Sequence, residues 1–115
     1  MAAVVLFTID PILQETARRL SPPPSAALRI VADRTQLHVE LSSAPGCVLF
    51  DLNVCQSADV LECVREIKGM AAGAQLIVFL DHLVGDLPVR AKLAGADRVV
   101  PRAQLERELA SLLQG

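Results

Sequence analysis

The feature that most constrains the fold is a regular alternation of short apolar runs with longer amphipathic segments. The runs lie at 3–8, 28–32, 47–52, 76–80 and 98–100, and each is too short to form a helix. Short apolar runs of this kind are typical of strands that are buried on both faces. The alternation therefore predicts an α/β fold, with a parallel sheet, helices on both of its faces and right-handed crossovers.

Helices are expected between these strands, at about 11–20, 34–42, 57–70, 88–94 and 103–113. Asp10 is a typical N-cap residue, Pro11 is tolerated at the first helical position, and three prolines at 22–24 end that helix. Leu105, Leu109 and Leu112 place one apolar face on the last helix. The sequence thus accounts for five strand–helix units in a single domain spanning 1–115.

The segment 34–42 leaves two interpretations open. Asp33 followed by Gln36 resembles a capping box, which favours a helix. Leu37, Val39 and Leu41, however, alternate with polar residues, as they would in an exposed strand.

Composition excludes several classes of function. The chain has 115 residues and a net charge of −2, from 11 basic and 13 acidic side chains that are scattered along it. The only aromatic residues are Phe7, Phe50 and Phe79, all expected in the core. Without a basic stripe or exposed aromatic rings, nucleic-acid binding by this chain alone is not expected. The longest apolar runs are far shorter than the roughly 20 residues of a membrane-spanning helix, and no secretory signal is evident, so we expect a cytoplasmic protein.

Three cysteines, Cys47, Cys55 and Cys63, form no Cys-x-x-Cys pair. An odd number without that spacing argues against a disulfide framework or a zinc site. We expect Cys47 and Cys63 to be small buried side chains, and a redox-sensing role for Cys55 stays open.

Functional residues of a parallel sheet gather beyond the carboxyl ends of its strands. In this chain those positions hold Thr8, Ile9 and Asp10, then Asp51 to Cys55, Leu80 to His82, and finally Pro101 with Arg102. Asp81 and His82 lie on the loop expected beside Asp51, where a proton-sensitive site and a solvated loop are both possible.

Two segments resemble the receiver domains of response regulators. They are VLFDLN at 48–53, which places Asp51 at the family's phosphoacceptor aspartate, and LAGADRVVPRAQL at 93–105. The resemblance covers essentially the whole chain. It implies a flavodoxin-like (βα)5 three-layer sandwich, with a five-stranded parallel sheet of order 2-1-3-4-5.

The residues that would hold a magnesium ion depart from the family pattern. Where the family has two adjacent acids after its first strand, this chain has Thr8 and Ile9, and Asp10 follows one position later. Asp10, Asp51 and the backbone carbonyl of Asn53 are therefore weak magnesium candidates, and we expect no metal cofactor.

The residues that would respond to a phosphoryl group are also replaced. Leu80 stands where the family has a Ser or Thr, Val99 replaces a switching aromatic residue, and Arg102 replaces a lysine. Arg102 could pair with Asp51 in place of a metal and fix one conformation.

The leading hypothesis is an atypical receiver, or pseudo-receiver, that is not an enzyme and acts as a protein-interaction module in bacterial signal transduction, largely independent of aspartyl phosphorylation. Its partner would be another signalling protein or a second copy, bound through the face of the fourth helix, fifth strand and fifth helix. That face carries Arg90, Lys92, Arg98, Val99 and Arg107.

Two alternatives stay open, the second of them from another class of function. One is a working single-domain phosphoacceptor that is phosphorylated on Asp51 in a two-component phosphorelay, with Mg²⁺ bound by Asp10. The other is a small enzyme or nucleotide binder, although no phosphate-binding glycine motif follows the first strand.

Overall fold

The computed structural model describes residues 4–20, 28–43, 45–51, 60–80 and 86–114. Strands and helices alternate along them as the sequence predicts. In chain order they are β1 (Val4–Phe7), α1 (Pro11–Leu20), β2 (Leu28–Val31), α2 (Arg34–Leu41), β3 (Cys47–Asp51), α3 (Val60–Met70), β4 (Gln75–Leu80), α4 (Leu87–Ala94), β5 (Arg98–Pro101) and α5 (Leu105–Gln114).

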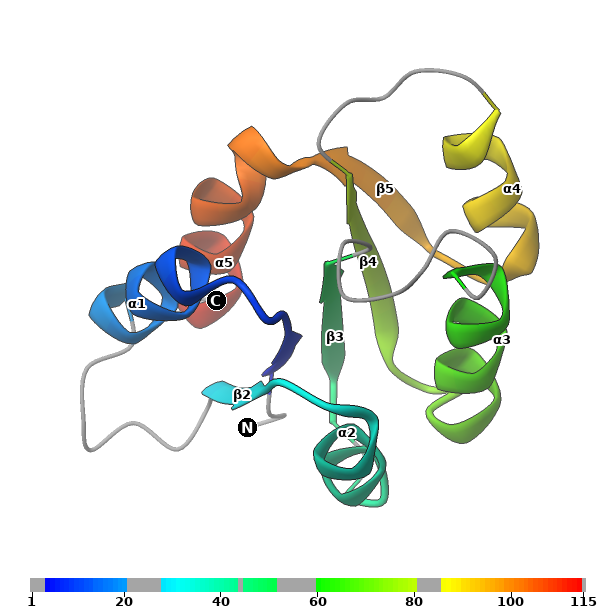
Figure 1. The fold of residues 1–115 in the computed structure, drawn as a ribbon, viewed down its shortest axis with the longest axis horizontal. Helices are drawn as coiled ribbons and strands as arrows, with labels where there is room; N and C mark the ends of the chain where they lie inside the picture. The colour runs from blue at the N-terminus through cyan, green and yellow to red at the C-terminus, as the bar shows by residue number, and fades with distance from the viewer. Residues whose placement is uncertain (1–3, 21–27, 44, 52–59, 81–85, 115) are drawn as a thin grey trace.

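The five strands form one parallel sheet of order β2-β1-β3-β4-β5. Figure 1 shows α1 and α5 on one face of this sheet and α2, α3 and α4 on the other. The predicted flavodoxin-like architecture and strand order are therefore confirmed.

The sheet has a separate apolar core on each face, because successive side chains along a strand point to opposite sides. Val5, Phe7, Val48 and Phe50 pack toward α2, α3 and α4, whereas Leu6, Leu49 and Phe79 pack toward α1 and α5. All three phenylalanines are buried, as predicted. Phe7 and Phe50 also stack on each other, with ring centroids 5.4 Å apart.

Capping decides the open question at 34–42 in favour of a helix. The carboxylate of Asp33 accepts a hydrogen bond of 2.8 Å from the backbone N–H of Gln36, and α2 follows. The Gln36 side chain accepts the N–H of Ala32, the residue before the cap, at 3.0 Å and so ties α2 to the end of β2. Because the segment is helical, its alternating residues are distributed around α2, and Val39 is exposed while Leu37 and Leu41 are buried.

A short 3₁₀ turn at Arg102–Gln104 separates β5 from α5, so the last helix begins at Leu105 and not at 103. Ile12, in the first turn of α1, is 75% exposed although it lies near the helical spacing of the apolar residues Leu13, Ala17 and Leu20. Over the residues that the structure describes, no helix is long and apolar enough to cross a membrane.

Candidate functional site

The site lies at the carboxyl edge of the sheet, where the strand register places two polar residues side by side. Phe7 of β1 is aligned with Phe50 of β3, so the next residues, Thr8 and Asp51, are also neighbours. The Thr8 hydroxyl donates a hydrogen bond of 2.8 Å to Oδ2 of Asp51. The exposed fraction is 0% for Thr8 and 1% for Asp51, so this hydrogen bond is fully buried.

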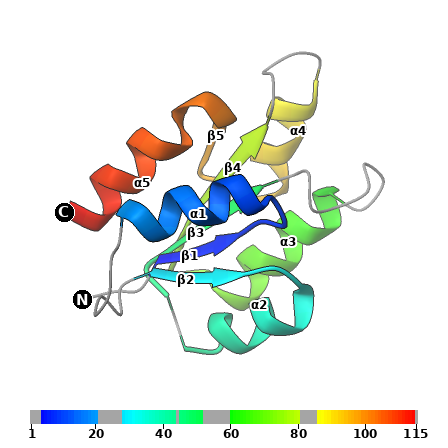
Figure 2. The ribbon, with the colours of Figure 1, turned by 60° about the vertical axis from the view of Figure 1, so that its left-hand side comes forward.

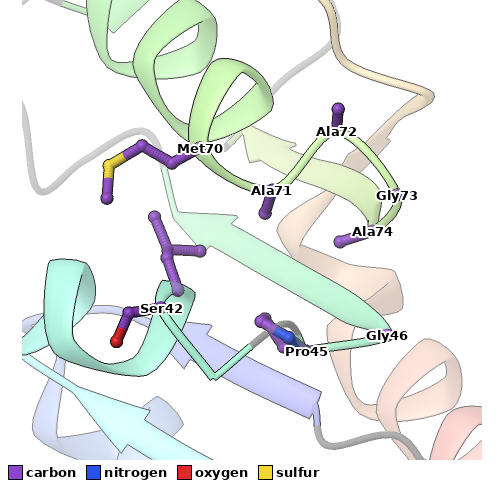
Figure 3. A pocket seen from close by; sticks show the side chains of 9 residues that line it. Ser42, Pro45, Gly46, Met70, Ala71, Ala72, Gly73 and Ala74 are labelled. Atoms are coloured by element: carbon purple, nitrogen blue, oxygen red, sulfur yellow. The ribbon is translucent and has the colours of Figure 1, made fainter.

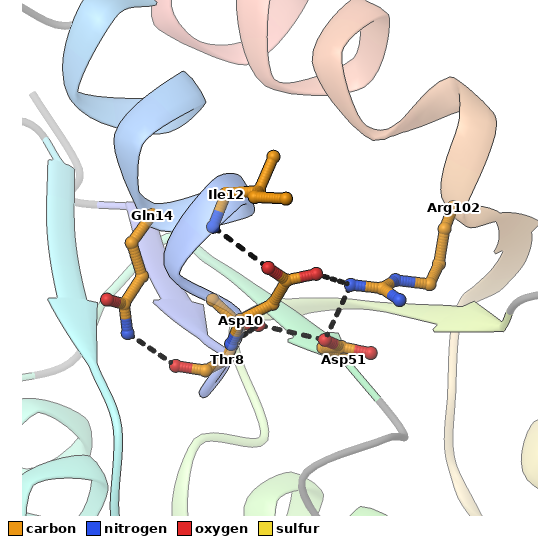
Figure 4. A network of polar contacts seen from close by, with 6 residues as sticks. All are labelled: Thr8, Asp10, Ile12, Gln14, Asp51 and Arg102. Carbon is orange, nitrogen blue, oxygen red and sulfur yellow. Dashed lines mark hydrogen bonds and ion pairs between the residues drawn. The ribbon is translucent and has the colours of Figure 1, made fainter.

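Arg102 lies between two carboxylates. Its Nη2 atom is 2.7 Å from Oδ2 of Asp10 and 3.3 Å from Oδ2 of Asp51. Figure 4 shows the guanidinium reaching in from the turn after β5 to both carboxylates. We call Thr8, Asp10, Asp51 and Arg102 the polar latch. It joins the ends of β1, β3 and β5, which are far apart in the sequence.

Asp10 has two roles in this arrangement. Its Oδ1 caps α1 by accepting the N–H of Ile12 at 2.8 Å, while its Oδ2 accepts from Arg102. These contacts, the one with Arg102 first, lower the pKa of Asp10 below its usual value of 3.8. The two interpretations of Asp10, as a helix cap and as a member of the site, are thus compatible.

The loop between β1 and α1 is further fixed by a residue that the sequence did not indicate. Gln14 donates through Nε2 to the carbonyl oxygen of Thr8 at 2.9 Å, and the N–H of Asp10 donates to the Thr8 hydroxyl at 3.1 Å. Nothing in the sequence marks Gln14, because a glutamine in the first turn of a helix is an ordinary surface residue.

Other predicted site residues do not join the latch. Leu80 is buried in the apolar core under α3 and α4, and Ile9 is 56% exposed. Asn53, Cys55, Asp81 and His82 lie outside the described residues.

A divalent cation does not fit the described latch as it stands. Asp10 and Asp51 both direct Oδ2 to one guanidinium nitrogen, whose positive charge occupies the place between them. Among the described residues, no group of three or more His, Cys, Asp or Glu side chains is arranged to hold a metal ion.

The predicted interaction face is largely open. Arg90, Lys92 and Arg107 are exposed, whereas Val99 is half-buried and packs against the core. Arg98 makes two hydrogen bonds of 2.7 Å to Glu108 on α5. Two exposed apolar residues, Val89 and Leu93, also lie on α4.

The two described cysteines are buried, in agreement with the prediction. Burial raises the pKa of the Cys47 thiol to about 11. Cys63 contacts Arg34 of α2, with Sγ and Nη2 3.1 Å apart. Glu66 of α3 forms an ion pair with the same arginine, and its carboxylate lies 2.5 Å from Nε2 of His38. These contacts form a polar cluster between α2 and α3 that the sequence did not predict.

A separate hollow of about 500 Å³ lies beside the first residues of β3, at the opposite end of that strand from Asp51. Figure 3 shows it between the ends of α2 and α3. Its described lining has no ionisable side chain, and consists of Leu41, Ser42, Pro45, Gly46, Met70, Ala71, Ala72, Gly73 and Ala74. The polar latch, and not this hollow, is therefore the candidate functional site.

The sequence matches no family model and no curated protein. The structure is similar to a CheY-like response regulator receiver domain from Methanospirillum hungatei, with a TM-score of 0.79, 14% identity, and coverage of 99% of this chain and 91% of that one. A LuxR-family response regulator from Aurantimonas gives a TM-score of 0.72, 24% identity and coverage of 99% and 83%.

A response regulator from Burkholderia pseudomallei, solved with a phosphorylated aspartic acid, a calcium ion and citrate, gives a TM-score of 0.73, 15% identity and coverage of 99% and 71%. These similarities extend over almost the whole chain and concern its fold. The chain thus has the fold of the CheY-like receiver domains of response regulators.

Proposed function

We propose that this chain is a receiver-like interaction module of bacterial two-component signalling, located in the cytoplasm, that works without aspartyl phosphorylation. It is not an enzyme and needs no metal. One observation carries the proposal: the guanidinium of Arg102 lies between Asp10 and Asp51, while Thr8 holds the same oxygen of Asp51.

This arrangement opposes phosphorylation for a chemical reason. Transfer of a phosphoryl group to a carboxylate requires an accessible oxygen in line with the donor and a cation that neutralises the developing charge, usually Mg²⁺. Here Oδ2 of Asp51 already accepts a hydrogen bond from Thr8 and forms an ion pair with Arg102, and the residue is 1% exposed. Leu80 offers no hydroxyl that could bind a phosphoryl oxygen and report its presence.

The test is labelling of the protein by acetyl phosphate with Mg²⁺, followed by mass spectrometry and peptide mapping. We expect little or no label on Asp51 of the wild-type chain. A variant with Thr8→Asp, Ile9→Asp, Leu80→Thr and Arg102→Lys restores the family's residues, and it should gain label that Asp51→Asn then removes. Robust labelling of wild-type Asp51 would overturn the proposal.

A working phosphoacceptor is the second candidate, because the two carboxylates converge on one point. If Arg102 moved away, Asp10 and Asp51 would face each other and could share a cation. The Burkholderia neighbour, which carries a phosphorylated aspartic acid, shows that this fold supports such chemistry in that protein. Saturable Mg²⁺ binding by the wild-type chain, lost in Asp51→Asn, would favour this candidate.

We assign partner binding to the face of α4, β5 and α5. Arg90 and Lys92 on α4 are exposed beside Val89 and Leu93, which are 61% and 83% exposed. Apolar side chains among cations suit a partner surface with apolar and acidic residues. The partner would be another signalling protein. Charge reversal by Arg90→Glu with Lys92→Glu should weaken its binding, with Arg65→Glu on α3 as a matched control.

A further inference from the structure

The outer edge of β2, the last strand of the described sheet, offers a second surface, distinct from the latch and from α4. In the described sheet, β2 pairs only with β1. The carbonyl oxygen of Val31 accepts the N–H of Thr8 at 3.1 Å, so the backbone groups of Val31 face β1. Because these groups alternate in direction along a strand, the N–H and carbonyl of Ile30 face outward.

Two depressions adjoin this edge. Figure 2 shows the β2 strand with α1 and α2 flanking it. One, of about 260 Å³, includes Ile30, Val31 and Val39 in its lining. The other, of about 380 Å³, includes Arg18 and Ile30. A second strand could therefore approach β2, with room for some of its side chains in these depressions.

The outward groups of Ile30 suit an identical strand. In an antiparallel pair, two directly opposed residues can exchange both of their N–H···O bonds. A two-fold axis perpendicular to the sheet at Ile30 would place Ile30 of each copy opposite Ile30 of the other. Ala32, whose N–H is donated to Gln36, limits how far the pairing extends.

The charges of the edge are also self-complementary, as a two-fold interface requires. Arg29 is exposed on β2, and Glu40 of α2 lies 3.9 Å from it while lining both depressions. Because Arg29 and Glu40 lie next to each other on this edge, a two-fold axis would allow Arg29 of each copy to form an ion pair with Glu40 of the other. Val39, which is 62% exposed, adds apolar surface next to this pair.

We propose that a second copy of this chain binds along the β2 edge and joins two five-stranded sheets into one continuous sheet. The association is weak, since the shared strand is four residues long and small interfaces are typically transient. It leaves the face of α4, β5 and α5 open to a different partner.

Sedimentation velocity over roughly 10 µM to 1 mM protein tests the proposal. The mean mass should rise toward that of a dimer. Arg29→Glu, which brings like charges together, should raise the dissociation constant about tenfold or more. Arg29→Glu combined with Glu40→Arg should restore association, and Leu93→Glu on α4 should leave it unchanged.

Backbone pairing is tested separately. Ile30→Pro removes the outward N–H, a change that an edge strand tolerates, and it should abolish association. In the wild-type chain, hydrogen exchange at the Ile30 amide should slow as the concentration rises. A mass that stays monomeric at the highest concentration, loss of association in Leu93→Glu, or exchange at Ile30 that is independent of concentration would each overturn the proposal.

Discussion

At the scale of single residues, the chemistry of Asp51 depends on its neighbours more than on its own identity. Its Oδ2 atom accepts from the Thr8 hydroxyl at 2.8 Å and lies 3.3 Å from Nη2 of Arg102. An aspartate held in this way is a structural anion. Thr8 and Arg102, the residues that replace an acid and a lysine of the family pattern, therefore determine what the carboxylate can do.

The bond between Thr8 and Asp51 should contribute to stability. Thr8→Val keeps the shape of this fully buried side chain but removes the donor to Asp51 and the acceptor of the Asp10 N–H. We expect the free energy of unfolding to fall by about 1–3 kcal/mol, measured by chemical denaturation. Thr16→Val, which removes an exposed bond from Arg19, should change it by less than about 0.5 kcal/mol.

Asp10 should make stability depend on pH in the acid range. Its pKa is lowered in the folded state, chiefly by Arg102, so its contribution is present above the unfolded value near 3.8. That contribution is lost as the pH falls through the folded value. Thermal unfolding at pH 7 and pH 3 should therefore show a larger loss for wild type than for Asp10→Asn.

Asp33→Asn is the matched control for this pH experiment. Asp33 caps α2 as Asp10 caps α1, but the described hydrogen bonds of Asp33 go to backbone groups and not to an arginine. Because Asn caps a helix about as well as Asp, this variant should retain the acid sensitivity of the wild type. Equal acid sensitivity in wild type and Asp10→Asn would contradict the role given to the ion pair.

At the scale of elements, the turn from α4 to β5 is fixed by contacts with α3. Gly95 ends α4 with a φ of 132°, and a Cβ there would lie 3.1 Å from Cβ and Cγ of Lys68. Lys68 in turn donates to Asp97 at 2.8 Å, and Asp97 accepts the N–H of Leu76 at 2.7 Å. Lys68 thus lies against Gly95 at the start of this turn and binds Asp97 at its end.

Gly95→Ala should destabilise the protein by about 1–3 kcal/mol, because it adds both a strained backbone and a close contact. Gly69→Ala, within α3, meets nothing within 4 Å and should stabilise the protein by up to about 1 kcal/mol. Denaturant titrations of the two variants measure this difference in sign. If Gly95→Ala stabilised the protein, the backbone at 95 and the Lys68 side chain would have to accommodate a Cβ without cost, which would contradict this prediction.

Element types were largely predictable, and the residue patterns show why. Asp10 with Pro11 and Asp33 with Gln36 carry their signals within one turn of chain, so local sequence suffices. The exposure of Ile12 and the contact of Gln14 with Thr8 were not predictable. Both depend on where the sheet edge lies relative to α1, which is not a local property.

At the scale of the whole molecule, two apolar cores share one sheet. Phe50 packs on the side of α2, α3 and α4, whereas Leu49, its neighbour in β3, packs on the side of α1 and α5. Each strand contributes side chains to both cores. Unpacking the helices from one face of the sheet should therefore also destabilise the packing on the other face. We therefore expect the described fold to unfold as one cooperative unit.

The two buried cysteines report on the two cores. Cys47 belongs to the core under α1 and α5, and Cys63 to the core under α2, α3 and α4. Thiol labelling across a denaturant titration, resolved by peptide mapping, should give the same midpoint for both and agree with circular dichroism. Exposure of Cys63 at clearly lower denaturant than Cys47 would show that the two layers unfold separately.

The sequence by itself determined the five strands, their order through the resemblance at Asp51 and in 93–105, and the burial of all three phenylalanines. These depend on periodicity, capping and motif spacing, which are encoded along the chain. The resemblance also suggested a pairing of Arg102 with Asp51, and the two side chains lie 3.3 Å apart. Only the tertiary structure decided that Thr8 binds Asp51, that Asp10 shares Arg102 with it, and that Leu80 lies in the apolar core. Such contacts depend on the register of the strands and on the direction that the backbone takes after each strand. Both are determined by how the two layers of helices pack on the sheet.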